Sequence, residues 1–300
     1  MKKFANKDRN TLSRLITLVE NHDPASLKIL TQLHKDTGQT HIIGITGPPG
    51  AGKSSLINQL IKHIVDHKMT VAVLATDPSS PYTGGSILGD RIRMQEQASH
   101  ENVYVRSLST RGSRGGLSRA TFDALKILDA FGFDFVILET VGVGQTEVDV
   151  MHFADTVILV LVPESGDDIQ TMKAGIMEIA DIFVINKSDR PGADTMKRNL
   201  LELKSPYKEL FIYLTQALQG KGIESLWTEI LKRKKSQKID TENESLQRRE
   251  ELSQIILSEL EKKLHQEKTN PFRSVYKDVQ KGALNPYEGA VRILKKMEKN

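Results

Sequence analysis

The sequence predicts an α/β fold with a mainly parallel sheet and helices on both of its faces. Three observations predict it: short apolar segments recur along the chain, amphipathic segments separate them, and a glycine-rich loop follows the first apolar segment. Segments that alternate in this way form βαβ units, whose strands run parallel and lie between layers of helices. Ligands of such sheets bind beyond the carboxyl ends of the strands. We therefore expect the functional site at that edge.

The apolar segments of the core are short and rich in β-branched residues, which is typical of buried strands. The predicted strands are residues 42–46, 71–75, 102–105, 135–139, 157–162, 182–185 and 211–214. Apolar residues at helical spacing predict helices between or after them, at residues 54–67, 87–98, 118–131, 168–180, 193–203 and 222–234. We expect these elements to form one domain at residues 41–236.

Two amphipathic helices are predicted before this domain, in an N-terminal extension at residues 1–40. They span residues 9–20 and 24–34, and an Asp-Pro pair stands at the start of the second. Aspartate caps the first turn of a helix, and proline fits its first position. We expect both helices to pack on the core.

A helical arm is predicted at residues 237–300, where the strand pattern stops. A polar linker begins it, and apolar residues then recur at helical spacing, first at 252–264 and again at Val291, Leu294 and Met297. An apolar stripe on a helix needs a surface to cover it. We expect the arm either to pack on the core or to join two copies of the chain.

The composition suits a globular cytoplasmic protein. Of 300 residues, 38% are hydrophobic and 27% are charged, and the net charge is +4. No run of 18 apolar residues predicts a membrane span, and the N-terminus lacks the apolar core of a signal peptide. The absence of cysteine excludes disulfides and thiolate metal sites. The basic cluster at residues 232–235 lacks interleaved aromatic residues and a known binding motif, so we expect neither nucleic acid nor membrane as a partner.

The phosphate-loop pattern G-x-x-x-x-G-K-[ST] occupies residues 47–54. Between a strand and a helix, this pattern binds nucleotide phosphates, because glycines let backbone amides turn inward and the helix N-terminus adds partial positive charge. We expect Lys53 to reach the β- and γ-phosphates and Ser54 to ligate Mg²⁺. The expected nucleotide contacts here are Gly47, Pro48, Pro49, Gly50, Ala51, Gly52, Lys53, Ser54 and Ser55.

A second motif, N-K-x-D, closes the predicted strand at 182–185. The Asp189 carboxylate can accept hydrogen bonds from both N1–H and the 2-amino group of guanine, whereas adenine offers neither donor there. A polar group left unpaired in a binding site costs enough free energy for strong selectivity. We expect Asn186 and Lys187 to brace this loop and cover the base.

Acidic residues follow two further strands. Glu139 begins the turn E-T-V-G, in the place of the D-x-x-G turn of GTPases, and the Gly142 amide could contact the γ-phosphate. Glu139 could also be a buried acid paired with Lys53 for structural reasons. Asp77 and Asp90 are candidate Mg²⁺ ligands, or else helix caps or turn residues. The expected metal ligands are Ser54, Asp77, Asp90 and Glu139, and the expected catalytic residues are Lys53, Glu139, Asp77 and Gly142.

Weaker candidates lie in two glycine-containing loops. Arg106, Arg111 and Arg114 belong to a loop that could touch phosphate or a partner, although such residues are more often solvated. Lys173 follows another strand end. The pair His63 and His67 lacks a third ligand, so we expect no metal there.

Together these motifs resemble the MeaB/ArgK-type GTPases, a branch of the P-loop NTPases of the SIMIBI-like kind. The resemblance covers most of the chain. The stretches T-G-G-S-I-L-G-D at residues 83–90 and E-T-V-G-V-G-Q at residues 139–145 are its most specific parts. It also includes D-P-S-S at residues 77–80 and G-K-G-I-E-S-L-W at residues 220–227, and it extends more loosely to N-P-Y at residues 285–287.

The resemblance implies a GTPase that binds GTP and GDP with Mg²⁺ and serves an adenosylcobalamin-dependent acyl-CoA mutase, above all methylmalonyl-CoA mutase. Such proteins gate cofactor loading and protect or reactivate the mutase, and they are usually homodimers that use C-terminal helices. The resemblance makes Glu139 the switch acid, Asp77 and Asp90 metal-site acids, and Lys173 part of a mobile segment that couples to the mutase. The base-closing S-A-L motif falls at Gln216, Ala217 and Leu218, where glutamine replaces serine.

Two other functions stay open. A metallochaperone GTPase for nickel would need cysteine or histidine ligands, and the chain offers no cysteine and no histidine cluster. A GTP-dependent kinase of a transport-system protein would transfer phosphate to a substrate other than water. No sequence signature of a substrate pocket favours that reaction.

Overall fold

The computed structural model describes most of the chain. The described residues are 8–21, 23–77, 99–109, 119–140, 153–164, 179–202, 210–236 and 272–297, with scattered positions between 249 and 264. The chain divides into two compact units, Met1–Thr241 and Glu242–Asn300. No helix in the described ranges is long and apolar enough to cross a membrane.

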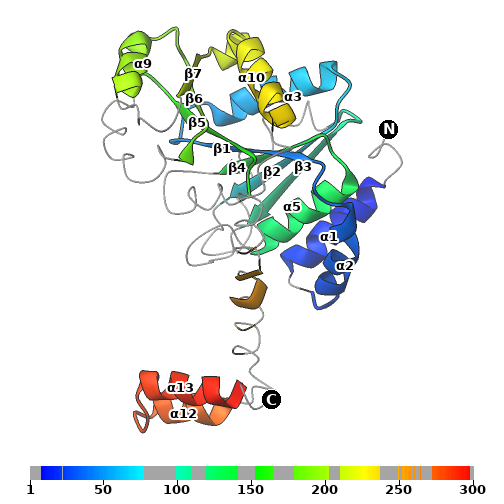
Figure 1. The fold of residues 1–300 in the computed structure, drawn as a ribbon, viewed down its shortest axis with the longest axis vertical. Coiled ribbons are helices and arrows are strands. Elements are labelled where there is room, and N and C mark those ends of the chain that lie inside the picture. The colour runs from blue at the N-terminus through cyan, green and yellow to red at the C-terminus, as the bar shows by residue number, and fades with distance from the viewer. Residues whose placement is uncertain are drawn as a thin grey trace. The chain divides into compact units, whose positions relative to one another are not determined.

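The first unit is built on a seven-stranded sheet with the order β3-β2-β4-β1-β5-β6-β7 (Figure 1). Every pair of neighbouring strands is parallel. The strands are β1 (His41–Thr46), β2 (Val71–Asp77), β3 (Val103–Ser109), β4 (Phe135–Thr140), β5 (Thr156–Leu161), β6 (Ile182–Ile185) and β7 (Phe211–Leu214). All seven predicted strands are confirmed, and β2 and β3 extend further than expected at their carboxyl ends.

Helices cover both faces of the sheet, as predicted. One face packs against α3 (Lys53–Asp66) and α10 (Ile223–Ser236), and the strand residues in this layer alternate with those of the other face. The opposite face packs against α5 (Arg119–Phe131) and, toward β6, against α9 (Ala193–Glu202). Figure 1 shows α3 and α10 on one side of the sheet and α5 on the other. The predicted helices at 87–98 and, but for its last residues, 168–180 lie outside the described residues.

The N-terminal helices α1 (Arg9–Glu20) and α2 (Ala25–Leu33) lie beside α5. Leu12, Ile16 and Val19 of α1 are buried in the α5 layer. Arg106 donates to Glu20 at 2.7 Å and so joins α1 to β3. The interpretation of Arg106 as a loop residue was therefore wrong: it belongs to β3, whose mixed polar end hides the strand pattern.

Three aspartates share one role at the amino edge of the sheet. Asp134, Asp155 and Asp181 each directly precede a strand, β4, β5 and β6. Each carboxylate accepts a hydrogen bond of 2.7–2.8 Å from a backbone amide at the start of the neighbouring strand, from Thr70, Ile42 and Val157 respectively. Each carboxylate gives a hydrogen-bond acceptor to a backbone N–H that is not paired with a neighbouring strand. The three aspartates thus help to fix the register of the sheet.

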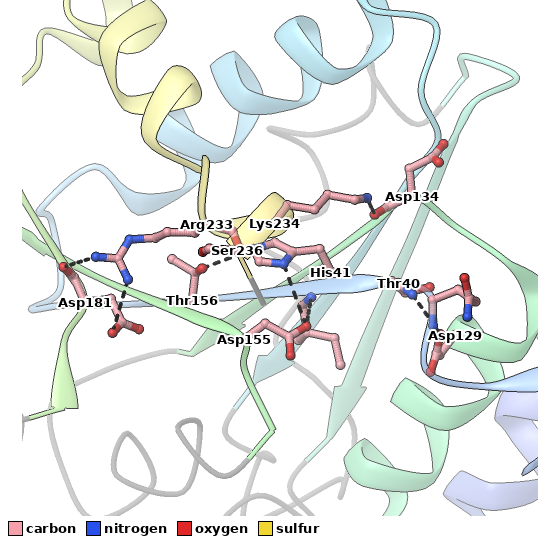
Figure 2. Close-up of polar contacts among 12 residues, drawn as sticks. Thr40, His41, Asp129, Asp134, Asp155, Thr156, Asp181, Arg233, Lys234 and Ser236 are labelled. Atoms are coloured by element: carbon pink, nitrogen blue, oxygen red, sulfur yellow. Dashed lines mark hydrogen bonds and ion pairs between the residues drawn. The ribbon is translucent and has the colours of Figure 1, made fainter. Parts of the chain in front are cut away.

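The last turn of α10 is tied to the same edge (Figure 2). Arg233 Nη1 lies 3.5 Å from Asp181 Oδ1, and Lys234 donates to the backbone carbonyl of Asp134. The Lys234 ammonium also lies 4.0 Å from the ring centroid of Phe135. Burial lowers the pKa of Lys234 below its ordinary value.

The second unit contains the helices α12 (Arg273–Gln280) and α13 (Pro286–Met297), which pack on each other. Gly289 forms the contact: a Cβ at this position would lie 2.9 Å from Val279 Cγ2. Two residues of the predicted stripe, Val291 and Leu294, are exposed instead, at 51% and 58%. Gly289, rather than these large apolar residues, forms the face that meets α12, and the stripe itself is left uncovered within the described part of this unit. α12 was not predicted from the sequence.

Candidate nucleotide site

The topology brings three motifs to the carboxyl edge of the sheet. β1 lies between β4 and β5, and β6 follows β5. The phosphate loop follows β1, the E-T-V-G motif begins with the last two residues of β4, and the N-K-x-D loop follows β6. Because parallel strands end at one edge, motifs up to about 140 residues apart in the sequence meet there.

The phosphate loop approaches its neighbours too closely for side chains at two glycines. Gly47 has φ +143°, and a Cβ there would lie 2.1 Å from the Val160 carbonyl oxygen. Gly52 has φ +89°, and a Cβ there would lie 2.3 Å from Asn186 Nδ2. Both the left-handed conformation and the close approach require glycine. The loop is therefore seated directly on β5 and on the N-K-x-D loop.

Lys53 opens α3 and is buried, with 8% exposed. Its ammonium group donates to the carbonyl oxygens of Gly47 at 2.7 Å and Pro48 at 3.3 Å. The charge thus lies inside the loop, beside the amides at the start of α3. A helix N-terminus with an ammonium group beside it is a favourable place for anionic oxygens.

Ser54 and Glu139 face each other across the loop. Ser54 Oγ donates to Glu139 Oε1 at 2.9 Å, and Glu139 is 4% exposed. Register explains the meeting: Glu139 of β4 pairs with Ile45 of β1, just before the loop begins. A hydroxyl and a carboxylate offer the oxygen ligands that Mg²⁺ prefers, so the donor set present here fits that ion.

Asn186 connects the phosphate loop to two other segments. Its side chain is buried at 2% exposed, and its Nδ2 donates to the Ala51 carbonyl at 2.9 Å. Its Oδ1 accepts from Thr215 Oγ1 at 3.1 Å and from the Ala217 amide at 3.0 Å. One amide side chain therefore holds together the phosphate loop, the N-K-x-D loop and the segment after β7.

Lys187 makes a second link to the phosphate loop. Its Nζ donates to the Gly50 carbonyl at 2.7 Å, and its backbone has the unusual φ of +54°. Arg190 donates to Glu164 at 2.6 Å, which lowers the pKa of Glu164 and joins this loop to the one after β5. Asp189 is exposed. The carboxylate with the predicted base-reading role thus belongs to a braced loop.

The segment after β7 carries the Q-A-L residues. Ala217 is buried and Leu218 is 87% exposed. The Gln216 amide donates to the Lys221 carbonyl at 3.0 Å, which closes the turn. Since the Ala217 amide already donates to Asn186, a base oxygen would have to share that donor.

The comparisons with known proteins place the chain in a family. Residues 12–269 match the family model for the methylmalonyl-CoA mutase-associated GTPase MeaB. The chain belongs to the MeaB family. A putative GTPase of Pyrococcus abyssi is 46% identical, over 97% of this chain and 93% of its own length. The GTPase ArgK of Escherichia coli is 38% identical, over 75% of this chain and 72% of its own length.

A crystal structure of an LAO/AO transport system kinase has the same fold as this MeaB-family chain. Its TM-score is 0.67 at 26% identity, over 99% of this chain and 95% of the other. The fold is therefore that of the P-loop NTPases, and the family assignment makes this protein a GTPase.

Several predicted site residues of this MeaB-family GTPase fall outside the described part of the chain. Asp77 ends β2, where its backbone pairs with Ser109, and its side chain is not described. Asp90, Gly142, Lys173, Arg111 and Arg114 lie outside the described residues. Sequence reasoning missed Thr215, which bonds to Asn186; its only signal was its position directly after the last strand, before the Q-A-L residues.

Proposed function

We propose that this protein binds and hydrolyses GTP as a chaperone of an adenosylcobalamin-dependent acyl-CoA mutase. The client would be methylmalonyl-CoA mutase or a close relative, whose cofactor loading the GTPase gates and which it protects or reactivates. The protein would act in the cytoplasm as a homodimer. The observation that supports the proposal best is the Asn186 network, because it links the phosphate loop to the loop that would read the base.

Guanine recognition would depend on Asp189. Its carboxylate can accept two N–H groups from guanine, and adenine would leave it unpaired. The loop that carries it is held by Asn186 and Lys187 through the carbonyls of Ala51 and Gly50. A rigid support favours selectivity, because a mismatched base cannot be accommodated by a shift of the loop. Ala217 and Leu218 would close the site over the base.

The triphosphate would occupy the phosphate loop, from Gly47 to Ser55. Lys53 would give up its contacts to the Gly47 and Pro48 carbonyls for phosphate oxygens. Ser54 and Glu139 would hold Mg²⁺, with Asp77 and Asp90 as further candidates. When bound, the ion neutralises phosphate charge and aids departure of the leaving group. Lys53 and the amides at the start of α3 would stabilise the same charge from the protein.

Glu139 is well placed to couple metal binding to the turn that follows it. It is buried, it contacts Ser54, and it is the first residue of the E-T-V-G motif. A GTPase senses its γ-phosphate through such a turn. We expect Gly142 to take part in that contact and Lys173 to act in coupling to the client. The family name, mutase-associated GTPase, supports the choice of client.

The experiment that tests this function measures GTP hydrolysis with and without purified methylmalonyl-CoA mutase. We expect slow turnover alone, stimulation by the mutase, and complex formation that differs between a non-hydrolysable GTP analogue and GDP. Glu139→Gln should bind GTP yet lose the stimulated rate. A fast rate that the mutase does not change would contradict the chaperone role, as would transfer of labelled phosphate from GTP to a protein.

A further inference from the structure

Two buried threonine hydroxyls lie at the edge of the sheet that carries the site. Thr46 is the last residue of β1 and Thr140 the last of β4, and they are 0% and 2% exposed. Within the part of the chain that the structure describes, neither Oγ1 has a hydrogen-bond partner. A buried hydroxyl without a partner costs free energy. Valine has nearly the same shape and would avoid that cost, so the two hydroxyls need an explanation.

The two threonines are neighbours that face the same side of the sheet. Ile45 pairs with Glu139 in the register of β1 and β4, and Thr46 and Thr140 are the next residues along these two strands. Val136 and Leu138 of β4 pack in the layer with α5. Because side chains alternate along a strand, Thr140 faces that layer too, and Thr46 faces it with Ile42, which packs against the same layer. Glu139 points to the opposite layer, toward Ser54.

The spacing suits one small polar molecule between the hydroxyls. Neighbouring strands lie about 4.8 Å apart, and a water molecule that bonds to two hydroxyls at about 2.8 Å each spans such a gap. Gly44, two residues before Thr46, places no side chain on this face of β1.

We infer that Thr46 and Thr140 together bind one ordered water molecule, which links the end of β1 to the end of β4. Buried waters typically satisfy polar groups that the protein itself leaves open. This link would join the residue before Gly47 to the residue after Glu139. It would thereby set the distance between the phosphate loop and the acid that contacts Ser54. The water site goes beyond the proposed function and does not depend on the client.

A double-mutant cycle tests the shared water. Trp227, the only tryptophan of the chain, is 1% exposed and reports urea unfolding by its fluorescence. Thr46→Val and Thr140→Val should each lower the urea midpoint. The double variant should have a urea midpoint no lower than that of the less stable single variant, because either substitution alone already releases the water. Raised midpoints or additive effects would overturn the inference.

Thr156→Val supplies the matched control. Thr156 is 0% exposed in the same sheet but lies at the amino edge, where its Oγ1 and His41 Nε2 are 3.1 Å apart. Its effect should add to that of Thr140→Val. Should a valine variant not fold, a high-resolution crystal structure of the wild-type protein decides the matter. Density for a water within hydrogen-bond distance of both hydroxyls supports the site, and its absence overturns it.

A nucleotide measurement tests the effect on the site and rests on the proposed function. Thr140→Val should weaken binding of Mg²⁺·GTP by about tenfold, a change of about 1.4 kcal/mol, and Thr156→Val should leave it unchanged. If the double-mutant cycle shows the shared water but Thr140→Val and Thr156→Val bind Mg²⁺·GTP with equal affinity, the link to the phosphate loop is overturned. Failure of the wild-type protein to bind GTP would instead contradict the proposed function.

Discussion

Ser54 Oγ donates to Glu139 Oε1 at 2.9 Å, so the first turn of α3 and the end of β4 meet at one hydrogen bond. Both groups offer oxygen atoms, and Glu139 is buried. The contact brings together the two groups that we propose as Mg²⁺ ligands. Two elements that are 85 residues apart in the sequence thus supply one candidate metal site.

Removal of the Ser54 hydroxyl should make the affinity for GTP independent of Mg²⁺. We expect Ser54→Ala to bind GTP with the same affinity in Mg²⁺ and in EDTA, since it lacks a ligand that the ion requires. The wild-type protein should bind at least about tenfold more tightly with Mg²⁺. Calorimetry measures both conditions. Ser26→Ala, at a buried serine of α2, is the control, and a Mg²⁺ dependence retained by Ser54→Ala would contradict the assignment.

Asn186→Ala should destabilise the protein as well as weaken nucleotide binding. It removes hydrogen bonds to Ala51, Thr215 and Ala217 and leaves their groups without that partner. A buried polar group that loses its hydrogen-bond partner costs about 1–3 kcal/mol. We expect Asn186→Ala to lower the free energy of unfolding by about 3 kcal/mol in total. Urea unfolding followed by Trp227 fluorescence gives the value. Stability equal to that of the wild type would show that the network does not hold the loops together.

Gly52→Ala and Gly38→Ala form a matched pair. Both glycines have φ near +90°, but only at Gly52 would a Cβ meet another group, Asn186 Nδ2 at 2.3 Å. Gly38→Ala should cost only the backbone strain, about 1 kcal/mol. Gly52→Ala should cost more and abolish GTP binding. Equal losses of stability in the two variants would mean that the close approach does not matter.

Lys234 should make stability depend on pH in the alkaline range. Burial lowers its pKa in the folded protein below 10.5. Between the lowered pKa and 10.5 the unfolded chain holds more protons than the folded one, so the free energy of unfolding rises with pH. We expect the difference between wild type and Lys234→Met to rise up to about pH 10.5 and then level off. A difference between the two proteins that stays constant with pH would contradict the lowered pKa of Lys234.

Asp189→Asn should change the preferred base from guanine to xanthine. An amide can still accept from N1–H but donates where guanine carries its 2-amino group, so guanine is disfavoured and xanthine, with an oxygen there, is favoured. We expect GTP to bind at least about a hundredfold more weakly and XTP more tightly than in the wild type. Competition binding measures both. Unchanged GTP affinity would remove Asp189 from the site.

The strands and the motifs could be predicted from the sequence because each depends on local pattern. Runs such as Phe135–Leu138 are apolar and partly β-branched, and the phosphate loop stands between such a run and a helical stripe. The end of β3 could not be predicted, since Arg106–Ser109 mixes polar and apolar residues. α12 was not predicted, and its contact with α13 could not be, because Gly289 forms that contact and carries no apolar side chain to mark it.

The long-range contacts of the site were beyond sequence reasoning. Nothing in the N-K-x-D motif indicates that Asn186 bonds to Thr215, 29 residues later, or that Gly52 is pressed against it. Likewise, the sequence could suggest that Glu139 pairs with Lys53, but it does not reveal the hydrogen bond from Ser54. Such contacts depend on strand order, which places β4 and β5 on either side of β1.

The most direct measurement is the affinity of the purified protein for GTP and for ATP by calorimetry with Mg²⁺ present. The arrangement of Lys53, Ser54, Asn186 and Asp189 predicts tight binding of GTP and binding of ATP at least about a hundredfold weaker. Equal binding of both nucleotides, or binding of neither, would contradict the account.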